Sequence, residues 1–224
     1  MTKSDLSSLL DGLALSRPIF HSEADFQHEL AFALRSENLY VRLEQPFDLQ
    51  KRVKNYPNKC ELDLLSIRES DKFRTAIELK YFRTSFSCEV DGEEFHLVNT
   101  WGTNLSRYDS WADFQRVQWL VDEGFASKGY SVVLTNASDA WQVNSETGNT
   151  YGKNFSLHQG RCYQRGERLD WHRDPTEKSI GAKRLSGSPI SIPNDGRCVW
   201  YPYSRLINAE NRNTEFRYLI FETR

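Results

Sequence analysis

Two short apolar segments separated by a polar turn constrain the fold more than any other feature of this chain. Residues 60–67 read CELDLLSI and residues 73–82 read FRTAIELKYF, and both are rich in the residues that β-strands favour. The five residues between them, RESDK, are polar and form a short connection. We therefore expect an antiparallel β-hairpin whose tip is centred on residues 70–71.

This hairpin would place two carboxylates opposite each other. Side chains alternate along a strand, so Glu78 and Lys80 share one face, while Ile77 and Leu79 pack on the other. With the tip at residues 70–71, Asp63 lies opposite Glu78. Such a pair repels unless something compensates, and a magnesium ion, which prefers carboxylate oxygens, would do so. Lys80 could then orient an attacking water or stabilise charge on phosphorus.

A helix precedes the hairpin. Ser22, followed by Asp25, is typical of a capped helix start, and apolar residues then recur at helical spacing through EADFQHELAFALRSE. Glu29 lies on the margin of that apolar stripe. We expect no regular element before this helix. Residues 40–49 predict a bent or edge strand, because Pro46 cannot donate a ladder hydrogen bond.

A helix and a buried strand follow the hairpin. We expect residues 83–100 to be irregular and a helix to cover Ser110 to Asp122, ending near Gly124 and Gly129. The β-branched run YSVVLTN then predicts a buried strand. A helix between two such strands indicates a crossover connection.

The C-terminal third has a weaker pattern. Gly, Pro and aromatic residues are frequent from about residue 140 onward, with short strands expected near Ser191, at residues 197–200 and at residues 215–222. We predict one domain over residues 1–224. Its α/β core would occupy residues 20–137, and residues 138–224 would form a β- and loop-rich elaboration packed on that core.

Composition limits the class of protein. No apolar run approaches the roughly 20 residues that span a bilayer, and Asp5 and Asp11 interrupt the N-terminal apolar stretch, unlike a signal peptide. The four cysteines form no CxxC pair, so we expect a reducing cytoplasm and no membrane association. Histidines in zinc-site spacing, a P-loop, a GxGxxG motif and a GxSxG motif are all missing from the sequence.

The motif Asp63…Glu78-Leu79-Lys80 resembles the D…(D/E)xK signature of the PD-(D/E)XK (restriction-endonuclease-like) nuclease superfamily. The expected element order over residues 20–137, helix, three strands, helix and strand, is also similar to that family's core, a central mixed sheet flanked by helices. Leu62 stands where the family often has proline. The resemblance implies a nuclease, most simply a DNA endonuclease, that uses Mg²⁺ or Mn²⁺ and could act as a homodimer.

The resemblance also implies further site residues. Several branches place a metal-binding Glu on the first helix, and Glu29 matches. In other branches, polar residues of the second helix approach the site. The candidates in this chain are Tyr108, Arg116 and Gln118, together with Asp113.

Simpler interpretations of these residues remain open. Glu78 and Lys80 could form an ordinary cross-strand ion pair, and Glu29 could be merely exposed. A catalytically silent relative of the same fold that binds nucleic acid or protein is the alternative function.

The distribution of charge gives a second indication of a polyanionic partner. Residues 150–224 hold 13 Lys and Arg against 8 Asp and Glu, although the whole chain has a net charge of -2. A solvated, loop-rich face explains this equally well. The residues that we expect to contact nucleic-acid phosphates are Lys153, Arg161, Arg165, Lys183 and Arg184.

Overall fold

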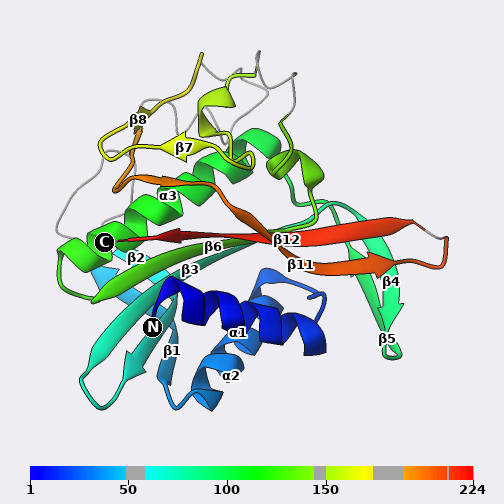
Figure 1. Ribbon diagram of the computed structural model, residues 1–224, viewed down its shortest axis with the longest axis horizontal. Helices are drawn as coiled ribbons and strands as arrows, with labels where there is room; N and C mark the ends of the chain where they lie inside the picture. The colour runs from blue at the N-terminus through cyan, green and yellow to red at the C-terminus, as the bar shows by residue number, and fades with distance from the viewer. Residues whose placement is uncertain (49–58, 144–149, 174–188, 211, 224) are drawn as a thin grey trace.

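A mixed six-stranded sheet forms the centre of the computed structural model, which describes residues 1–48, 59–143, 150–173, 189–210 and 212–223 (Figure 1). Its strand order is β1-β2-β3-β6-β12-β11. Only β3 and β6 run parallel among these neighbours. In sheet order the strands are β1 (Tyr40–Asp48), β2 (Lys59–Arg68), β3 (Phe73–Phe82), β6 (Lys128–Thr135), β12 (Asn213–Glu222) and β11 (Trp200–Ile207).

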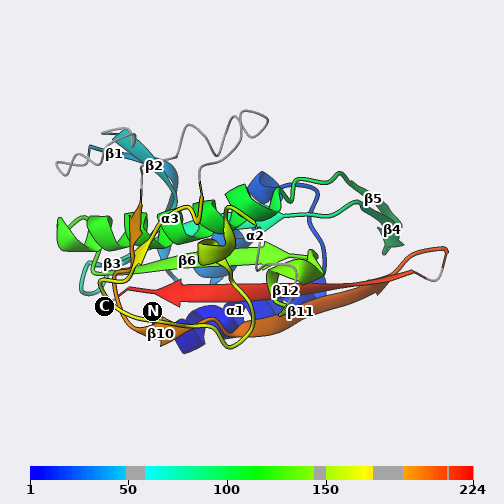
Figure 2. The same ribbon diagram turned by 90° about the horizontal axis from the view of Figure 1, so that it is seen from above.

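Helices cover both faces of this sheet (Figures 1 and 2). Helices α1 (Lys3–Ser16) and α2 (Glu23–Ser36) share one hydrophobic core with the sheet, and α3 (Thr103–Asp122) belongs to the other. The predicted α/β class, with a central mixed sheet flanked by helices, is confirmed. Among the described residues, no helix has the length and apolarity needed to cross a membrane.

The predicted hairpin is present with the predicted register. Leu64 pairs with Ile77, and Arg68 pairs with Phe73 at the end next to the turn. Strand β1 is an edge strand, as Pro46 indicated.

The crossover between β3 and β6 is confirmed as well, with α3 in the connection. Helix α3 begins at Thr103, earlier than predicted, and ends beside Gly124, whose φ of 76° suits a helix stop. Gly129 does not belong to this stop. It lies inside β6, where a Cβ atom would come within 2.9 Å of Val117, so its missing side chain lets α3 approach the sheet.

Two predicted irregular regions are regular, and those predictions were wrong. The N-terminus forms α1, which Thr2 and Asp5 cap reciprocally and which buries three leucines. Residues 83–100 contain a second hairpin, β4 (Phe86–Val90) and β5 (Glu93–Leu97). Its two-residue turn has positive φ at both Asp91 and Gly92, the conformation that an Asp-Gly pair favours.

The C-terminal third is not simply an elaboration on a finished core, which corrects our prediction. Strands β11 and β12 complete the central sheet, with β12 directly against β6. Short strands do occur where expected, as β9 (Ile190–Ser191) and β10 (Gly196–Arg197). The other short elements are η1 (Ser138–Ala140), η3 (Lys153–Phe155), β7 (Cys162–Tyr163) and β8 (Arg168–Leu169).

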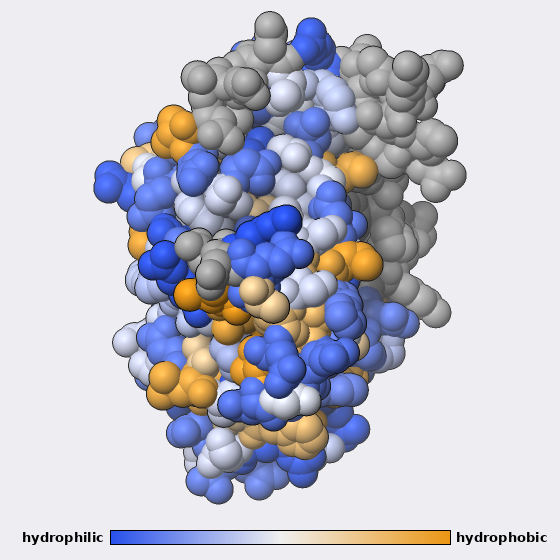
Figure 3. Space-filling view, turned by 90° about the vertical axis from the view of Figure 1, so that its right-hand side faces the viewer, coloured by the Kyte–Doolittle hydropathy of each residue, from blue (hydrophilic) through white to orange (hydrophobic). Residues whose placement is uncertain are grey.

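The surface is mainly hydrophilic on the face seen in Figure 3, with small separate hydrophobic groups. The most exposed large apolar side chains come from separate elements, as is usual on globular surfaces. They are Leu15, Phe32, Tyr40, Val98, Val143 and Ile207.

Candidate active site

Asp63 lies where the sheet opens. The β2–β3 ladder extends from the turn only to the pair Leu64–Ile77, and the β1–β2 ladder skips Asp63 and Glu44, whose φ is 48°. Two other contacts replace the missing ladder bonds. Gln27 donates to the Asp63 carbonyl (2.8 Å), and the Leu79 amide donates to Asp63 Oδ2 (2.6 Å). The carboxylate is thereby fixed against β3.

Glu78 is fully buried and is held by an arginine of α3. Arg116 donates from Nε to Glu78 Oε1 (2.9 Å) and from Nη2 to Oε2. Such a two-point contact fixes the plane of the carboxylate. Arg116 also forms an ion pair with Asp113 (2.9 Å), one turn earlier on the helix.

Lys80 joins the sheet to both helices. Its Nζ atom lies 3.3 Å from Asp113 Oδ2 and 3.9 Å from Glu23 Oε1. Glu23 is in the first turn of α2, and its other oxygen accepts a hydrogen bond from the Tyr81 amide (2.7 Å). The ammonium group therefore sits between carboxylates from α2 and α3.

Three residues of α3 form a polar stripe toward these strands. Asp109, Asp113 and Arg116 follow one another at spacings of four and three residues, so they share one face of the helix. Asp109 interacts electrostatically with Asp113, Lys80, Arg116 and Glu23.

Carboxyl groups outnumber cations in this cluster. Among the described residues, the cations of this cluster are Lys80 and Arg116, against five carboxyl groups: Asp63, Glu78, Asp109, Asp113 and Glu23.

Burial and the excess of negative charge shift the pKa values of this cluster. Burial raises the pKa of Asp63 to about 6, against the opposing effects of the Leu79 hydrogen bond and Lys80. Burial also raises the pKa of Asp109 to about 6 and that of Glu78 well above its ordinary value. Asp113 raises the pKa of Lys80, so this amine stays protonated at neutral pH.

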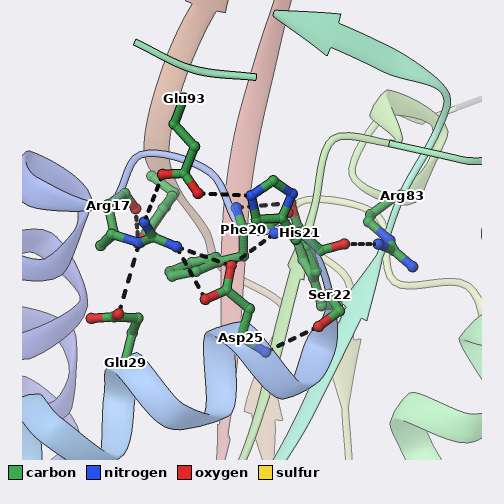
Figure 4. A network of polar contacts seen from close by, with 10 residues as sticks. Arg17, Phe20, His21, Ser22, Asp25, Glu29, Arg83 and Glu93 are labelled. Carbon is green, nitrogen blue, oxygen red and sulfur yellow. Dashed lines mark hydrogen bonds and ion pairs between the residues drawn. The ribbon is translucent and has the colours of Figure 1, made fainter. Parts of the chain in front are cut away.

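The structure gathers Asp63, Glu78, Lys80 and Arg116 but points Glu29 elsewhere. At about 100° per residue, Glu29 lies about 200° around α2 from Gln27, which contacts Asp63. Its ion pair is with Arg17, at 3.9 Å, within the network that Figure 4 shows. Glu23 is the carboxylate of α2 that reaches Lys80.

Tyr108 and Gln118 also lie apart from the cluster. Tyr108 is buried against Trp171, with stacked rings 5.3 Å apart, and burial raises the pKa of Tyr108 to about 12. Gln118 donates to Asp122 (2.9 Å), along α3.

The structure describes three of the five predicted phosphate-contacting residues, and they differ in exposure. Arg161 is largely buried, with its guanidinium 4.9 Å from the centre of the Trp111 ring, whereas Arg165 is exposed and Lys153 is half-buried in η3. Lys183 and Arg184 lie outside the described residues.

A metal site here would need two carboxylates and several waters. Within the described ranges, no three His, Cys, Asp or Glu side chains converge as a ready-made ligand set. Mg²⁺ commonly uses only one or two protein carboxylates, and Asp63 and Glu78 supply that donor chemistry. Asp113 Oδ2 is buried without a hydrogen-bond partner, although it is ion-paired with Lys80. Arg116 occupies both oxygens of Glu78, so the ion would have to compete with it.

The remaining members of the cluster are only weakly indicated by the residue pattern. The spacing of Asp109, Asp113 and Arg116 is visible as a polar stripe, but surface helices carry such stripes too. Glu23 resembles an ordinary acidic residue in the first turn of a helix, which the helix dipole stabilises. Gln27 gave no signal, because its role depends on the opening of the sheet at Asp63.

Comparison of the chain with protein-family models, with curated proteins and with solved structures gives no match.

Proposed function

We propose that this chain is a magnesium-dependent nuclease with a restriction-endonuclease-like core, acting most directly on DNA. The observation that carries the proposal is that the Asp63 carboxylate accepts from the Leu79 amide, between Glu78 and Lys80 on the neighbouring strand, so acids from two strands and the Lys80 ammonium lie close together. The hairpin register brings Asp63 to the end of the β2–β3 ladder, next to its last pair, Leu64–Ile77.

Asp63 and Glu78 would hold the ion. A bound Mg²⁺ polarises a phosphate and lowers the pKa of its water. The ion would also offset the excess of carboxylates and keep both ligands ionised. Glu23, rather than Glu29, is the helix carboxylate that we place next to this site, because it contacts Lys80.

Lys80 acts in this proposal as a permanent cation. Because Asp113 raises the pKa of Lys80, the amine cannot serve as a general base at neutral pH. A protonated amine beside the carboxylates can donate to the attacking water or to a phosphate oxygen as charge develops. Arg116 is the second cation. When the ion binds, Arg116 can remain hydrogen-bonded to Glu78 or turn toward the phosphate.

Plasmid cleavage tests the enzyme hypothesis. Supercoiled DNA with Mg²⁺ should be nicked or linearised by the native protein and by Lys128→Ala, and not by Lys80→Ala. Lys128 is a matched control, because it lies on the adjacent strand β6, is 23% exposed against 21% for Lys80, and has its own ion pair with Glu222 at 3.1 Å. Equal loss in both variants would contradict the assigned role of Lys80. Parallel reactions with single-stranded DNA and RNA define the substrate.

Metal binding can be measured without activity. Mg²⁺ or Mn²⁺ should raise the melting temperature of the native protein, because ligands of the folded state stabilise it. The rise should disappear in Asp63→Asn and persist in Glu94→Gln, which changes an exposed carboxylate on β5. A similar rise in both variants would contradict a site at Asp63.

The catalytically silent alternative has one observation in its favour, the complete occupation of Glu78 by Arg116. A silent protein would show no metal-dependent stabilisation and no cleavage, and would retain nucleic acid or protein binding. Homodimer formation belongs to the same proposal for the enzyme, since cutting both strands is simplest with two active sites.

A further inference from the structure

Two carboxylates of the candidate active site are less exposed than the cations that contact them. The side chains of Arg116 and Lys80 are 18% and 21% exposed, whereas those of Glu78 and Asp113 are 0% and 4% exposed. A molecule that approaches these pairs from solvent therefore meets the guanidinium and the ammonium groups first. Such a surface attracts an anion, whereas a cation has to pass two positive charges to reach Glu78.

Arg116 competes directly with any cation for Glu78. Its Nε donates to Oε1 at 2.9 Å and its Nη2 donates to Oε2, so both oxygens of this carboxylate already accept a hydrogen bond. Glu78 is fully buried, and water therefore does not screen the pair. A divalent cation beside Glu78 would be repelled by the guanidinium at this distance. The two positive groups exclude each other in part, and one of them has to withdraw.

A second carboxylate gives Arg116 a place to which it can withdraw. Asp113 lies one turn earlier on α3, with its Oδ1 atom 2.9 Å from Arg116 Nη2. Arg116 can release Glu78 while it keeps this contact, so its charge remains paired. The movement is less costly for that reason, because breaking a buried ion pair is expensive mainly when it leaves a charge without a partner.

A phosphate group would favour the same movement. A guanidinium can bind two oxygens of one phosphate, and Arg116 is partly exposed and can reach such a ligand. Lys80 lies two residues from Glu78 on β3 and is partly exposed as well. A phosphate that contacts both cations would draw Arg116 away from Glu78 and leave that carboxylate to a metal ion.

We propose that Arg116 couples two binding events at the candidate active site, because it leaves Glu78 for a nucleic-acid phosphate and thereby admits a divalent cation. This inference rests on the proposed function, in which Glu78 is a ligand of the ion. Without nucleic acid, Arg116 keeps the affinity for the ion low. The coupling is reciprocal, so the ion strengthens the binding of the phosphate by the same factor.

Calorimetric titration with Mn²⁺ in the absence of nucleic acid tests the competition. Arg116→Met should bind Mn²⁺ about ten times more tightly than the native protein, because the competing charge is gone. The double variant Glu78→Gln/Arg116→Met should lose this gain. Arg217→Met is the matched control, since Arg217 is 29% exposed and forms its own ion pair with Glu215 at 2.9 Å on β12. It should leave the Kd for Mn²⁺ unchanged.

The same titration with a saturating DNA duplex tests the coupling. The heat of Mn²⁺ binding to the duplex alone is subtracted, and a gel confirms that the duplex is intact afterwards. The duplex should tighten Mn²⁺ binding about fivefold or more in the native protein and in Arg217→Met, and by less than about twofold in Arg116→Met. If Arg116→Met does not fold, Arg116→Lys keeps the charge but loses the two-point contact, and it should bind Mn²⁺ more tightly than the native protein without DNA.

The outcomes separate this inference from the proposed function. If neither the native protein nor the Arg116 variants bind Mn²⁺, the proposed metal site is wrong and the coupling is wrong with it. If the native protein binds Mn²⁺ but the Arg116 variants bind it no more tightly, the metal site stands and the coupling alone is overturned. An undiminished effect of the duplex in the Arg116 variants would overturn the coupling in the same way.

Discussion

The two polar networks that involve α2 differ mainly in burial. The network of Arg17, Asp25, Glu29 and Glu93 in Figure 4 lies toward solvent and joins the α1–α2 connection to the β5 strand. The cluster around Glu78 lies between the sheet and α3. Both contain arginine–carboxylate pairs of similar length, such as Arg17 with Asp25 at 3.0 Å and Arg116 with Glu78 at 2.9 Å.

Burial gives these similar contacts different consequences. Water screens the exposed pairs, so each contributes little to stability and can be rearranged at low cost. The buried cluster cannot be screened, and removing one partner leaves a charge that nothing else compensates. Surface networks of this kind hold segments in position. The buried cluster keeps charged groups in an environment that shifts their pKa values, and active sites use such shifts.

The largest effect should follow loss of the Glu78 partner. Arg116→Met leaves a buried carboxylate without its two donors and should lower the free energy of unfolding by about 3 to 5 kcal/mol at neutral pH. Urea denaturation measures this loss. The double variant Glu78→Gln/Arg116→Met should recover part of it, because no buried charge remains. A loss below about 1 kcal/mol would mean that this cluster is as well screened as the exposed network.

A smaller effect, of opposite sign, should follow removal of the Asp63 charge. The folded-state pKa of Asp63, about 6, exceeds its ordinary value of 3.8, so the folded protein binds this proton more tightly than the unfolded chain. Stability from this group is therefore present at low pH and is lost as the pH rises from about 4 to about 6. Asp63→Asn should increase the free energy of unfolding at pH 7 by about 1 to 2 kcal/mol, with little change at pH 4. Destabilisation at pH 7 would contradict this.

Loss of Arg17 from the exposed network should cost less than either change. Arg17→Met removes two hydrogen bonds to Asp25, one to Glu93 and the longer contact with Glu29, and we expect a loss of about 0.5 to 1 kcal/mol. The loss should shrink in 1 M NaCl, where screening lengths are about 3 Å. If the loss in the free energy of unfolding is unchanged at high salt, the contacts of Arg17 are not screened by solvent and resemble those of the buried cluster.

The smallest effect should be that of Glu93→Gln. Glu93 is exposed and contacts Arg17 at 3.1 Å and His21 at 2.8 Å, so its removal should change the unfolding midpoint by no more than the measurement error. Its effect should instead be local, as faster amide hydrogen exchange in β5. Unchanged exchange would show that these contacts do not hold the hairpin.

Local signals in the sequence predicted the elements of the centre of the sheet well. The hairpin register, the crossover helix and the buried strand follow from residue alternation, from apolar spacing and from the turn RESDK. The same periodicity predicted Asp63 opposite Glu78, whereas the β2–β3 ladder ends one pair earlier, at Leu64–Ile77, and Asp63 contacts the Leu79 amide. These features depend on neighbouring residues, which a sequence displays directly.

Features that depend on distant partners could not be read in this way. Glu23 and Glu29 both lie on α2, and which of them reaches the cluster depends on where α2 crosses the sheet. Strand β12 has an ordinary strand pattern, but nothing in it specifies β6 as its neighbour. The pairing of Arg116 with Glu78 likewise joins two elements whose approach depends on Gly129.

The insertion of β12 beside β6 has a consequence for synthesis of the chain. Thr135 pairs with Arg217, so one edge of β6 stays unpaired while the intervening residues emerge from the ribosome. An unpaired edge of apolar residues is a template for wrong pairing with another chain. Helix α1 also depends on β12, because Ser7 and Asp11 both bond Tyr218 of β12. Helix α1 and strand β12 are thus fixed in place together, and a nascent chain stopped before β12 would leave the edge of β6 exposed to chaperones and proteases.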